Sequence, residues 1–204
     1  MSRKKEGSWG DDVGSAAWAR IVAPAPGDLR IVQALVNTVD LVTGVDDLAS
    51  PRAVADWLAR WRLVPPDAEI AKADFQRALD VRDGLRTMVG ANRGGSVDAA
   101  ALAKLDRAVF AVALRVRFDA GGATRYEPTG DGFEGALGRL VQLVASARAE
   151  GLWRRLKLCA DPDCRRAFFD GSQNRAGKWC SMSRCGGRFK SRAFRRRHPG
   201  HRQG

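Results

Sequence analysis

Apolar side chains recur every three to four positions through most of residues 28–151, which is the period of an amphipathic α-helix. The first such segment follows Asp28, which we expect to cap a helix that ends near Gly44. A second opens at Ser50-Pro51, the order of an N-cap and a first-turn proline. Further helices are predicted over residues 67–90, 96–105 and 133–151, with Ser96 as the cap of the middle one.

A strand period interrupts the helical one ahead of the last of these helices. Residues 114–118 alternate apolar and charged side chains, Gly121-Gly122 marks a turn, and residues 124–126 can return as a second strand. Residues 1–27 are rich in Gly, Ala, Ser and Pro and are expected to form a flexible leader. We therefore predict a mainly α-helical domain over residues 28–151 with one small β-hairpin.

The chain changes character after Gly151. Residues 152–204 carry 15 Lys/Arg against 3 Asp/Glu, a net charge of +12, whereas residues 1–151 carry 20 of each and sum to zero. The same segment holds all four cysteines in two C-x4-C pairs, which are Cys159, Cys164, Cys180 and Cys185. A second, strongly basic unit is therefore predicted over residues 152–204.

The cysteine pattern favours a metal site over disulfides. No apolar run approaches the length of a membrane span, and no secretory signal is recognisable, so we expect a cytoplasmic protein with no membrane partner. In that reducing compartment paired cysteines more often bind metal, and two disulfides are the alternative. Four thiolates would bind one structural Zn²⁺ and fill its tetrahedron, which leaves no position for hydrolytic chemistry.

The finger is expected to be treble-clef-like or zinc-ribbon-like. Residues 167–169 and 178–179 are predicted as two short strands around a turn at 170–174, and a helix is predicted to start near Ser181. On that helix Cys185, Phe189 and Ala193 would face the metal and the arginines would face outward. Gly186-Gly187 should either kink this helix or allow a close approach of backbone or phosphate.

The basic helix is the candidate nucleic-acid interface. Arginine forks match phosphate oxygens and guanine edges, which makes double-stranded DNA the first expected partner. A merely solvated face, an anionic membrane surface or an acidic protein are the alternatives. The candidate contacts are Arg175, Lys178, Arg184, Arg188, Lys190, Arg192, Arg195 and Arg196.

Two other functions remain open at this point. RNA could bind the same finger if the rings of Phe168, Phe169 and Trp179 were exposed for base stacking. An enzyme in the helical body is a further alternative, with the finger as a structural unit. No catalytic activity is expected, because the chain shows no phosphate-binding glycine loop and no nucleophile elbow, and its two histidines lie in the tail.

Four polar residues in the predicted helices are candidate ligand contacts. Arg82 interrupts an apolar stripe, Arg86 lies one turn further, and Asn37 and Asp40 lie on the first helix. A buried charge needs a partner, so an internal salt bridge of Arg82 with Asp40 or another acid is the favoured interpretation. The alternative is that the four groups converge on an anionic or polar ligand.

The finger segment resembles a known family. Residues 159–197 are similar to the CGNR zinc finger through the four cysteines and the residues between them, namely Phe168, Phe169, Asp170, Ser172, Trp179, Ser181, Met182, Gly186, Arg188, Lys190 and Arg192. Gly187 stands where the family has Asn, so any contact of that Asn would be lost or replaced by backbone.

The body resembles the ABATE domain that usually precedes this finger. The resemblance runs through residues 35–40, Trp57-Leu58, residues 78–82 and Leu85-Arg86. It implies a bacterial stress-induced transcription regulator with a ligand-sensing N-terminal domain and a DNA-binding C-terminal one. A homodimer would suit such a regulator, although no residue pattern here requires one.

Overall fold

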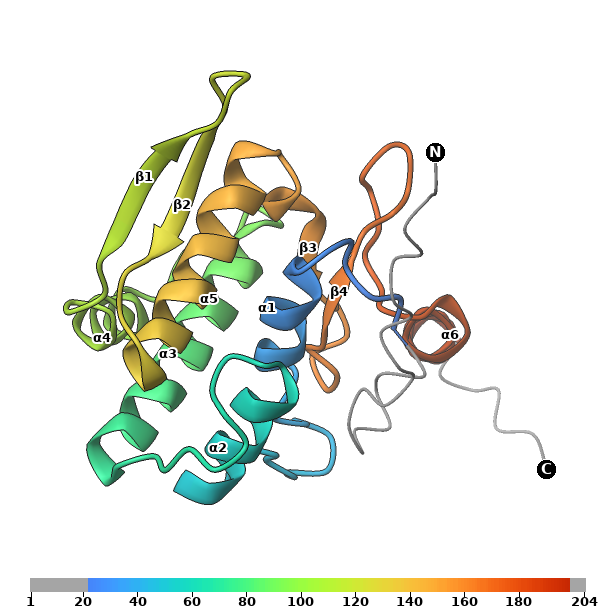
Figure 1. Ribbon diagram of the computed structural model, residues 1–204. Helices are drawn as coiled ribbons and strands as arrows, with labels where there is room; N and C mark the ends of the chain where they lie inside the picture. Colours follow the sequence, from blue (N-terminus) through green and yellow to red (C-terminus); the bar gives the residue numbers. More distant parts are fainter. Residues whose placement is uncertain (1–21, 199–204) are drawn as a thin grey trace, which may run out of the picture.

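The computed structural model describes residues 22–198 and shows a helical body followed by a small β-containing unit and a last helix at its side (Figure 1). The body contains α1 (Leu29–Val36), α2 (Pro51–Arg60), α3 (Lys72–Ala91), α4 (Ala99–Ala108), β1 (Leu114–Phe118), β2 (Thr124–Pro128) and α5 (Gly132–Ala149). The C-terminal unit contains the 3₁₀ turn η1 (Trp153–Arg155), β3 (Leu156–Leu158), β4 (Ala167–Phe169), the π-helical turn η2 (Met182–Gly186) and α6 (Gly187–Arg197). The predicted class, mainly α with a cysteine-bearing finger, is confirmed.

The short helix α1 forms the centre of the body. Every residue of α1 except Arg30 is buried, as expected of a helix surrounded by other elements. It packs against α3 and α5 and also against β4 of the C-terminal unit. The long helices α3 and α5 therefore share one hydrophobic core with a strand that comes 130 residues after α1.

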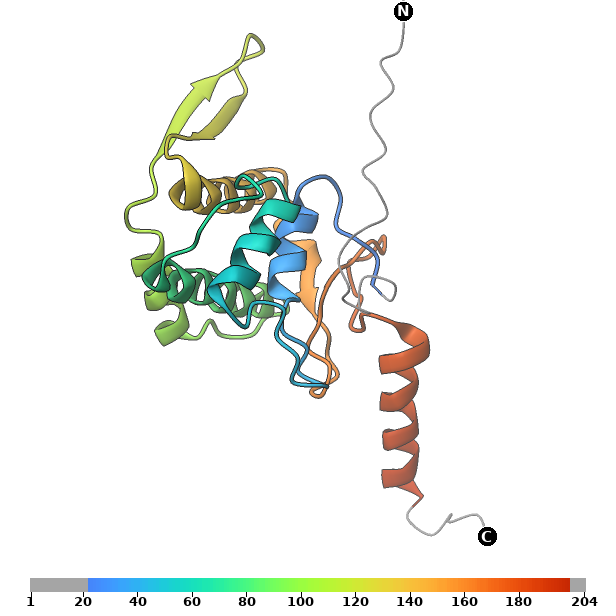
Figure 2. The ribbon, with the colours of Figure 1, turned by 60° about the horizontal axis from the view of Figure 1, so that its bottom comes forward.

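Two close approaches fix the outer elements of the body. At Gly84 of α3 an added Cβ would lie 2.4 Å from Leu105 Cβ, so only glycine allows α4 to cross there. At Gly138 of α5 an added Cβ would lie 2.9 Å from Pro128 Cβ, where the β1–β2 hairpin packs. The antiparallel hairpin then extends away from the body, as Figure 2 shows, and Phe118 near its tip is 73% exposed.

The C-terminal unit begins inside the core of the body. Trp153, Leu156, Leu158 and Ala167 belong to the same buried cluster as the helices. The Asn92 side-chain amide at the end of α3 donates 2.8 Å hydrogen bonds to the carbonyls of Trp153 and Leu156. Strands β3 and β4 therefore serve as a base that the helical body supports, while the predicted division at residue 151 stays a prediction.

Several element ends differ from the sequence-based expectation. Asp28 occupies the N-cap position of α1 but makes no capping bond, because its carboxylate pairs with Arg139 at 2.6 Å. The cap of α4 is Asp98, which accepts from the amides of Ala100 and Ala101, and not Ser96. Ser50 does cap α2, as predicted, by accepting from the amide of Ala53 at 3.1 Å.

Three further predictions were wrong in detail. Helix α1 ends at Val36 and not near Gly44, so Asn37 is its C-cap and Asp40 lies in the loop that follows. Helix α3 begins at Lys72 and not at Asp67, because the segment after Pro65-Pro66 first forms a turn. Residues 178–179 are not a strand, since only a single main-chain bond, from the Ala160 amide to the Lys178 carbonyl, links them to residues 159–164, the first knuckle. The partner of β4 is β3 instead, in antiparallel register from Leu156↔Phe169 to Leu158↔Ala167.

Candidate metal centre and basic helix

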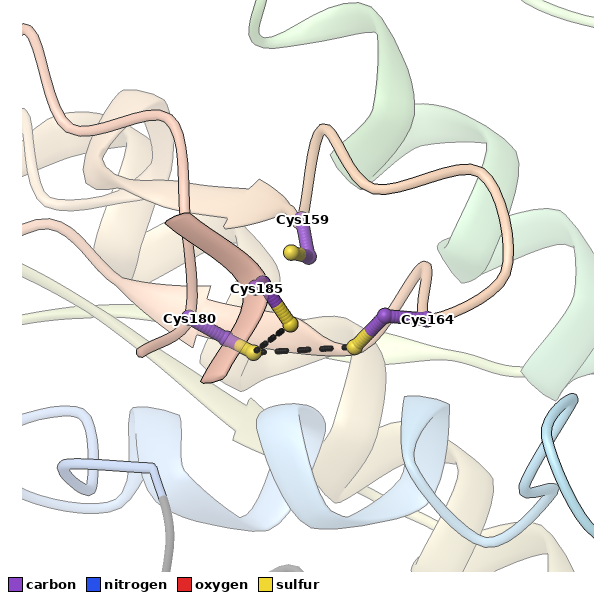
Figure 3. Close-up of side chains that lie close together, drawn as sticks. All are labelled: Cys159, Cys164, Cys180 and Cys185. Carbon is purple, nitrogen blue, oxygen red and sulfur yellow. Dashed lines mark hydrogen bonds between the residues drawn. The ribbon is translucent and has the colours of Figure 1, made fainter. Parts of the chain in front are cut away.

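The four cysteines meet at one point between the body and α6 (Figure 3). Cys159 follows β3, Cys164 ends the first knuckle, Cys180 precedes η2, and Cys185 lies within η2. Their sulfurs all lie within 4.8 Å of one another, with 3.6 Å between Cys164 and Cys180 and 3.7 Å between Cys180 and Cys185.

These distances fit zinc and exclude disulfides. Sulfurs at about 2.3 Å from a tetrahedral Zn²⁺ would lie about 3.8 Å apart, whereas bonded sulfurs lie about 2 Å apart. All four cysteines are free, and only Cys180 is not fully buried. The cluster is therefore a closed structural site for one zinc ion, with all four ligands supplied by the chain.

Electrostatics also favour a cation at this position. Hydrogen bonds from the thiols of Cys164 and Cys180 lower the pKa of Cys159 to about 4, so one thiolate forms readily. Hydrogen bonding to Cys159 and Cys164 in turn raises the pKa of Cys180, because further negative charge is disfavoured. A bound cation would stabilise four thiolates at this position, and Zn²⁺ is the ion that this ligand set selects.

Arginines of α6 support the metal centre from outside. The carboxylate of Asp161, which is 2% exposed between the first two cysteines, lies 2.8 Å from Arg188 and 3.5 Å from Arg192. Arg188 also donates to the Cys185 sulfur at 3.2 Å, and Arg192 pairs with Asp163. These two predicted nucleic-acid contacts are thus partly neutralised, and they fix the direction of α6.

The start of α6 is packed by an aromatic pair and a close approach. The rings of Trp179 and Phe189 lie 4.9 Å apart between centroids. An added Cβ at Gly186 would lie 3.1 Å from the Met182 sulfur, a contact that the exposed Met182 side chain can relieve. Gly187 differs, because an added Cβ would meet nothing closer than 3.9 Å, so the family's Asn would fit there.

The rest of α6 is a solvent-exposed cationic rod. None of its residues is buried, it carries no acidic residue, and Figure 2 shows it projecting away from the body. Arg195 and Arg197 bond only to carbonyls of their own helix among residues 22–198. Within the described residues, the α6 cations that do not pair with the first knuckle are Lys190, Arg195, Arg196 and Arg197. Arg197 was not among the predicted contacts, although it continues the same arginine run.

The remaining predicted contacts lie next to α6. Arg184 belongs to η2, and Arg175 and Lys178 belong to the loop over residues 170–178; all three are exposed. Arg175 has a φ of 52°, a left-handed conformation that this loop imposes.

Asp170 organises that loop from a buried position. It accepts hydrogen bonds from Lys157 Nζ at 2.7 Å and from the amides of Ser172 and Gly177 at 3.1 and 2.8 Å. Burial alone would raise the pKa of Asp170, but Lys157 and Ser172 hold that pKa well below its usual range. Gly177 is required, because an added Cβ would lie 2.7 Å from the Asp170 carboxylate.

Asp170→Ala is expected to destabilise the protein by about 3–5 kcal/mol at neutral pH, because it leaves the buried Lys157 ammonium without its carboxylate partner. Since the pKa of Asp170 is lowered by folding, its stabilisation is complete above the unfolded pKa of about 4 and is lost as pH falls toward the folded value. The difference in Tm between wild type and variant should therefore disappear as the pH falls. Asp163→Ala, at a 59% exposed acid, is the control. A Tm difference that stays the same at all pH values would contradict the role of Asp170 as the partner of Lys157.

The four candidate ligand contacts are occupied by protein groups. Arg82 forms a bidentate pair with Asp46 at 2.7 and 2.8 Å, which is the favoured internal salt bridge, although Asp40 is not its partner. Asp40 pairs with Arg166 instead. Asn37 donates to the Ala167 carbonyl at 2.9 Å and accepts from the Ala167 amide at 2.8 Å.

Arg86 completes this set from α3. It donates to the carbonyls of Val36 at 2.6 Å and Arg165 at 3.0 Å, and burial lowers its pKa. Asn37, Asp40 and Arg86 therefore all contact residues 165–167, directly after the zinc ligand Cys164. Sequence reasoning found these polar residues but not this junction, because their partners are mostly main-chain atoms that carry no side-chain signal.

Two family models match the chain, one after the other. Residues 29–153 match the ABATE model, described as "Putative stress-induced transcription regulator", and residues 155–198 match the CGNR zinc finger model. No curated protein matches the chain. Within residues 22–198, no helix is both long and apolar enough to cross a membrane. Neither family description names an enzyme.

Proposed function

The chain belongs to the ABATE family and carries a CGNR zinc finger, and from that premise we propose that it regulates transcription by binding double-stranded DNA through α6. The single observation that carries the proposal is the exposure of α6. Six of its eleven residues are Arg or Lys, none is acidic and none is buried. Such a helix gains little stability from packing within the protein, and its charges are suited to a polyanionic surface.

The dimensions of α6 fit the major groove. An α-helix with side chains is about 10–12 Å across, and the groove is about 12 Å wide. The zinc centre fixes only the N-terminal end of α6, through Cys185 and the arginine pairs with Asp161. The exposed end, from Lys190 to Arg197, is therefore the part that would enter the groove.

RNA binding by base stacking is less well supported. Phe168 is 5% exposed and lies within the protein, and the Trp179 ring packs on Phe189. The aromatic surface on which RNA bases would have to stack is thus largely covered by protein. Nearby cations such as Arg175 and Lys178 remain exposed and could contact the phosphates of a duplex.

Replacing Lys190, Arg195, Arg196 and Arg197 together by Gln should weaken duplex binding by about 100-fold or more at low salt, because phosphate contacts dominate affinity. Fluorescence anisotropy with a labelled duplex measures this. The control removes three charges in place of four, at Arg115, Arg117 and Arg125 of the β1–β2 hairpin, which lies on the opposite side of the body from α6 (Figure 1). That control should bind within about two-fold of wild type.

Two outcomes would overturn the proposal. Equal loss in both variants would show that binding follows net charge and not α6. Stronger competition by a structured RNA hairpin than by duplex DNA would assign the finger to RNA. Zinc content and circular dichroism should match wild type in both variants, since none of the substituted α6 residues contacts the metal ligands.

A further inference from the structure

A cavity of about 760 Å³ lies between α3, α4 and the first zinc knuckle. The body contributes Arg86, Thr87 and Lys104 to its lining, and the C-terminal unit contributes Leu158 and Arg165. Its volume is within the range of about 300–1,000 Å³ that is typical of small-molecule sites. It therefore has the size of a ligand site and is formed jointly by the two family segments of the chain.

The acidic groups of this cavity already have partners. Asp83 pairs with Arg82 at 3.0 Å, and Asp80 accepts from the Gln76 amide at 3.2 Å. Asp98 caps α4 and accepts from two main-chain amides. These carboxylates thus have donors near them that do not depend on a ligand.

Within residues 22–198, the cationic groups of the cavity form no ion pair with a carboxylate. Arg86 is bound only to two main-chain carbonyls, and no carboxylate lies within 4 Å of it among residues 22–198. In the same described part of the chain, the side chains of Arg165 and Lys104 make no hydrogen bond or ion pair. Three cations thus line one cavity with unused donors, beside the hydroxyls of Thr87 and Ser96.

We propose that this cavity binds a small organic anion, with its carboxylate or phosphate oxygens at Arg86, Arg165 and Lys104. Charge-assisted hydrogen bonds from guanidinium and ammonium groups are the strongest neutral-pH contacts for such oxygens. Leu41, Leu158 and Ala101 supply apolar surface for the body of the ligand. The site goes beyond DNA binding by α6, and its occupancy can be measured without nucleic acid.

The position of the site links it to the metal centre. Arg165 directly follows the zinc ligand Cys164, and its carbonyl already accepts from Arg86. An anion bound between Arg86, Arg165 and Lys104 would add a second connection between α3, α4 and the knuckle. Binding is therefore expected to raise the unfolding temperature of the zinc-loaded chain as well as to shift its NMR signals.

The test is a ¹⁵N–¹H NMR titration of the zinc-loaded full chain with benzoate, succinate and inorganic phosphate, at constant ionic strength. At least one probe should shift the amides of residues 96–104 saturably, with a Kd of about 1 mM or tighter. Lys104→Ala and Arg165→Ala should each weaken that Kd by about five-fold or more. Arg107→Ala, on the same helix α4 but outside the cavity, is the control and should leave it unchanged.

The probes separate the two sources of anionic oxygen, because benzoate and succinate report on carboxylates and phosphate on phosphoryl groups. Failure of all three to shift residues 96–104 would overturn the proposal. Shifts confined to α6 would overturn it equally, because they would reflect general attraction to the basic helix. An equal effect of Lys104→Ala and Arg107→Ala would also overturn it. None of these results bears on duplex binding by α6, which the anisotropy assay tests separately.

Discussion

Removal of zinc is expected to abolish duplex binding while leaving the helical body folded. Helix α6 has eleven residues, no buried side chain and six like charges, so it is too short to persist in isolation. Its support comes from η2, which contains Cys185, and from the contacts of Asp161 with Arg188 and Arg192. The buried cluster formed by α1, α3 and α5 contains none of the four cysteines.

Chelation should therefore lower duplex affinity by at least about 100-fold, since zinc binding in such units is worth about 10–16 kcal/mol of folding free energy. Cys180→Ser should have the same effect. Circular dichroism should lose the contribution of α6 and keep that of the body. Returning one equivalent of Zn²⁺ should restore binding to the chelated protein, whereas Mg²⁺ should not. Unchanged duplex affinity in the metal-free protein would contradict the structural role of the zinc centre.

Asn37→Ala is expected to destabilise the whole chain more than its small size suggests. The Asn37 amide makes two hydrogen bonds with the main chain of Ala167, and both groups are buried. Alanine would leave the buried amide and carbonyl of Ala167 without those partners, at a cost of about 2–4 kcal/mol in the free energy of unfolding. The lost hydrogen bonds lie at the contact between the end of α1 and β4, the strand that supports the zinc site.

Differential scanning calorimetry should show this as a fall of about 4–16 °C in Tm, because 1 kcal/mol corresponds to about 2–4 °C in a chain of this size. Asn174→Ala, in the exposed turn of the loop over residues 170–178, is the control and should change Tm by about 2 °C or less. A variant of Asn37 with unchanged Tm would show that the junction does not depend on this side chain.

The sequence predicted what is local and strongly patterned. The four cysteines could be predicted as a metal site because each supplies a thiolate ligand. The apolar period located every long helix of the body. The β1–β2 hairpin was predicted for the same reason, through its alternation and the Gly121-Gly122 turn. Helix caps were less predictable, since Ser96 and Asp98 are equally good caps and only the packing of α4 selects Asp98.

The sequence could not predict contacts that depend on distant main-chain atoms. Asn37 binds the backbone of a residue 130 positions later, and no side chain marks that partner. The faces of α6 were also beyond prediction, because Asp161 attracts Arg188 and Arg192 toward the knuckle only once the chain has folded around the metal. The helical period predicted that the arginines share one face of α6. It could not predict that Asp161 pairs with two of them.

The salt dependence of duplex binding by the zinc-loaded chain tests the central claim most directly. If the exposed cations Lys190, Arg195, Arg196 and Arg197 contact phosphates, the slope of log Kobs against log salt should be about −3.6 or steeper, since each contact contributes about −0.9. The quadruple Gln variant of these residues should show a slope that is shallower than the wild-type slope by about 3.6. No binding of the wild-type chain at low salt, or a wild-type slope as shallow as that of the variant, would contradict the account.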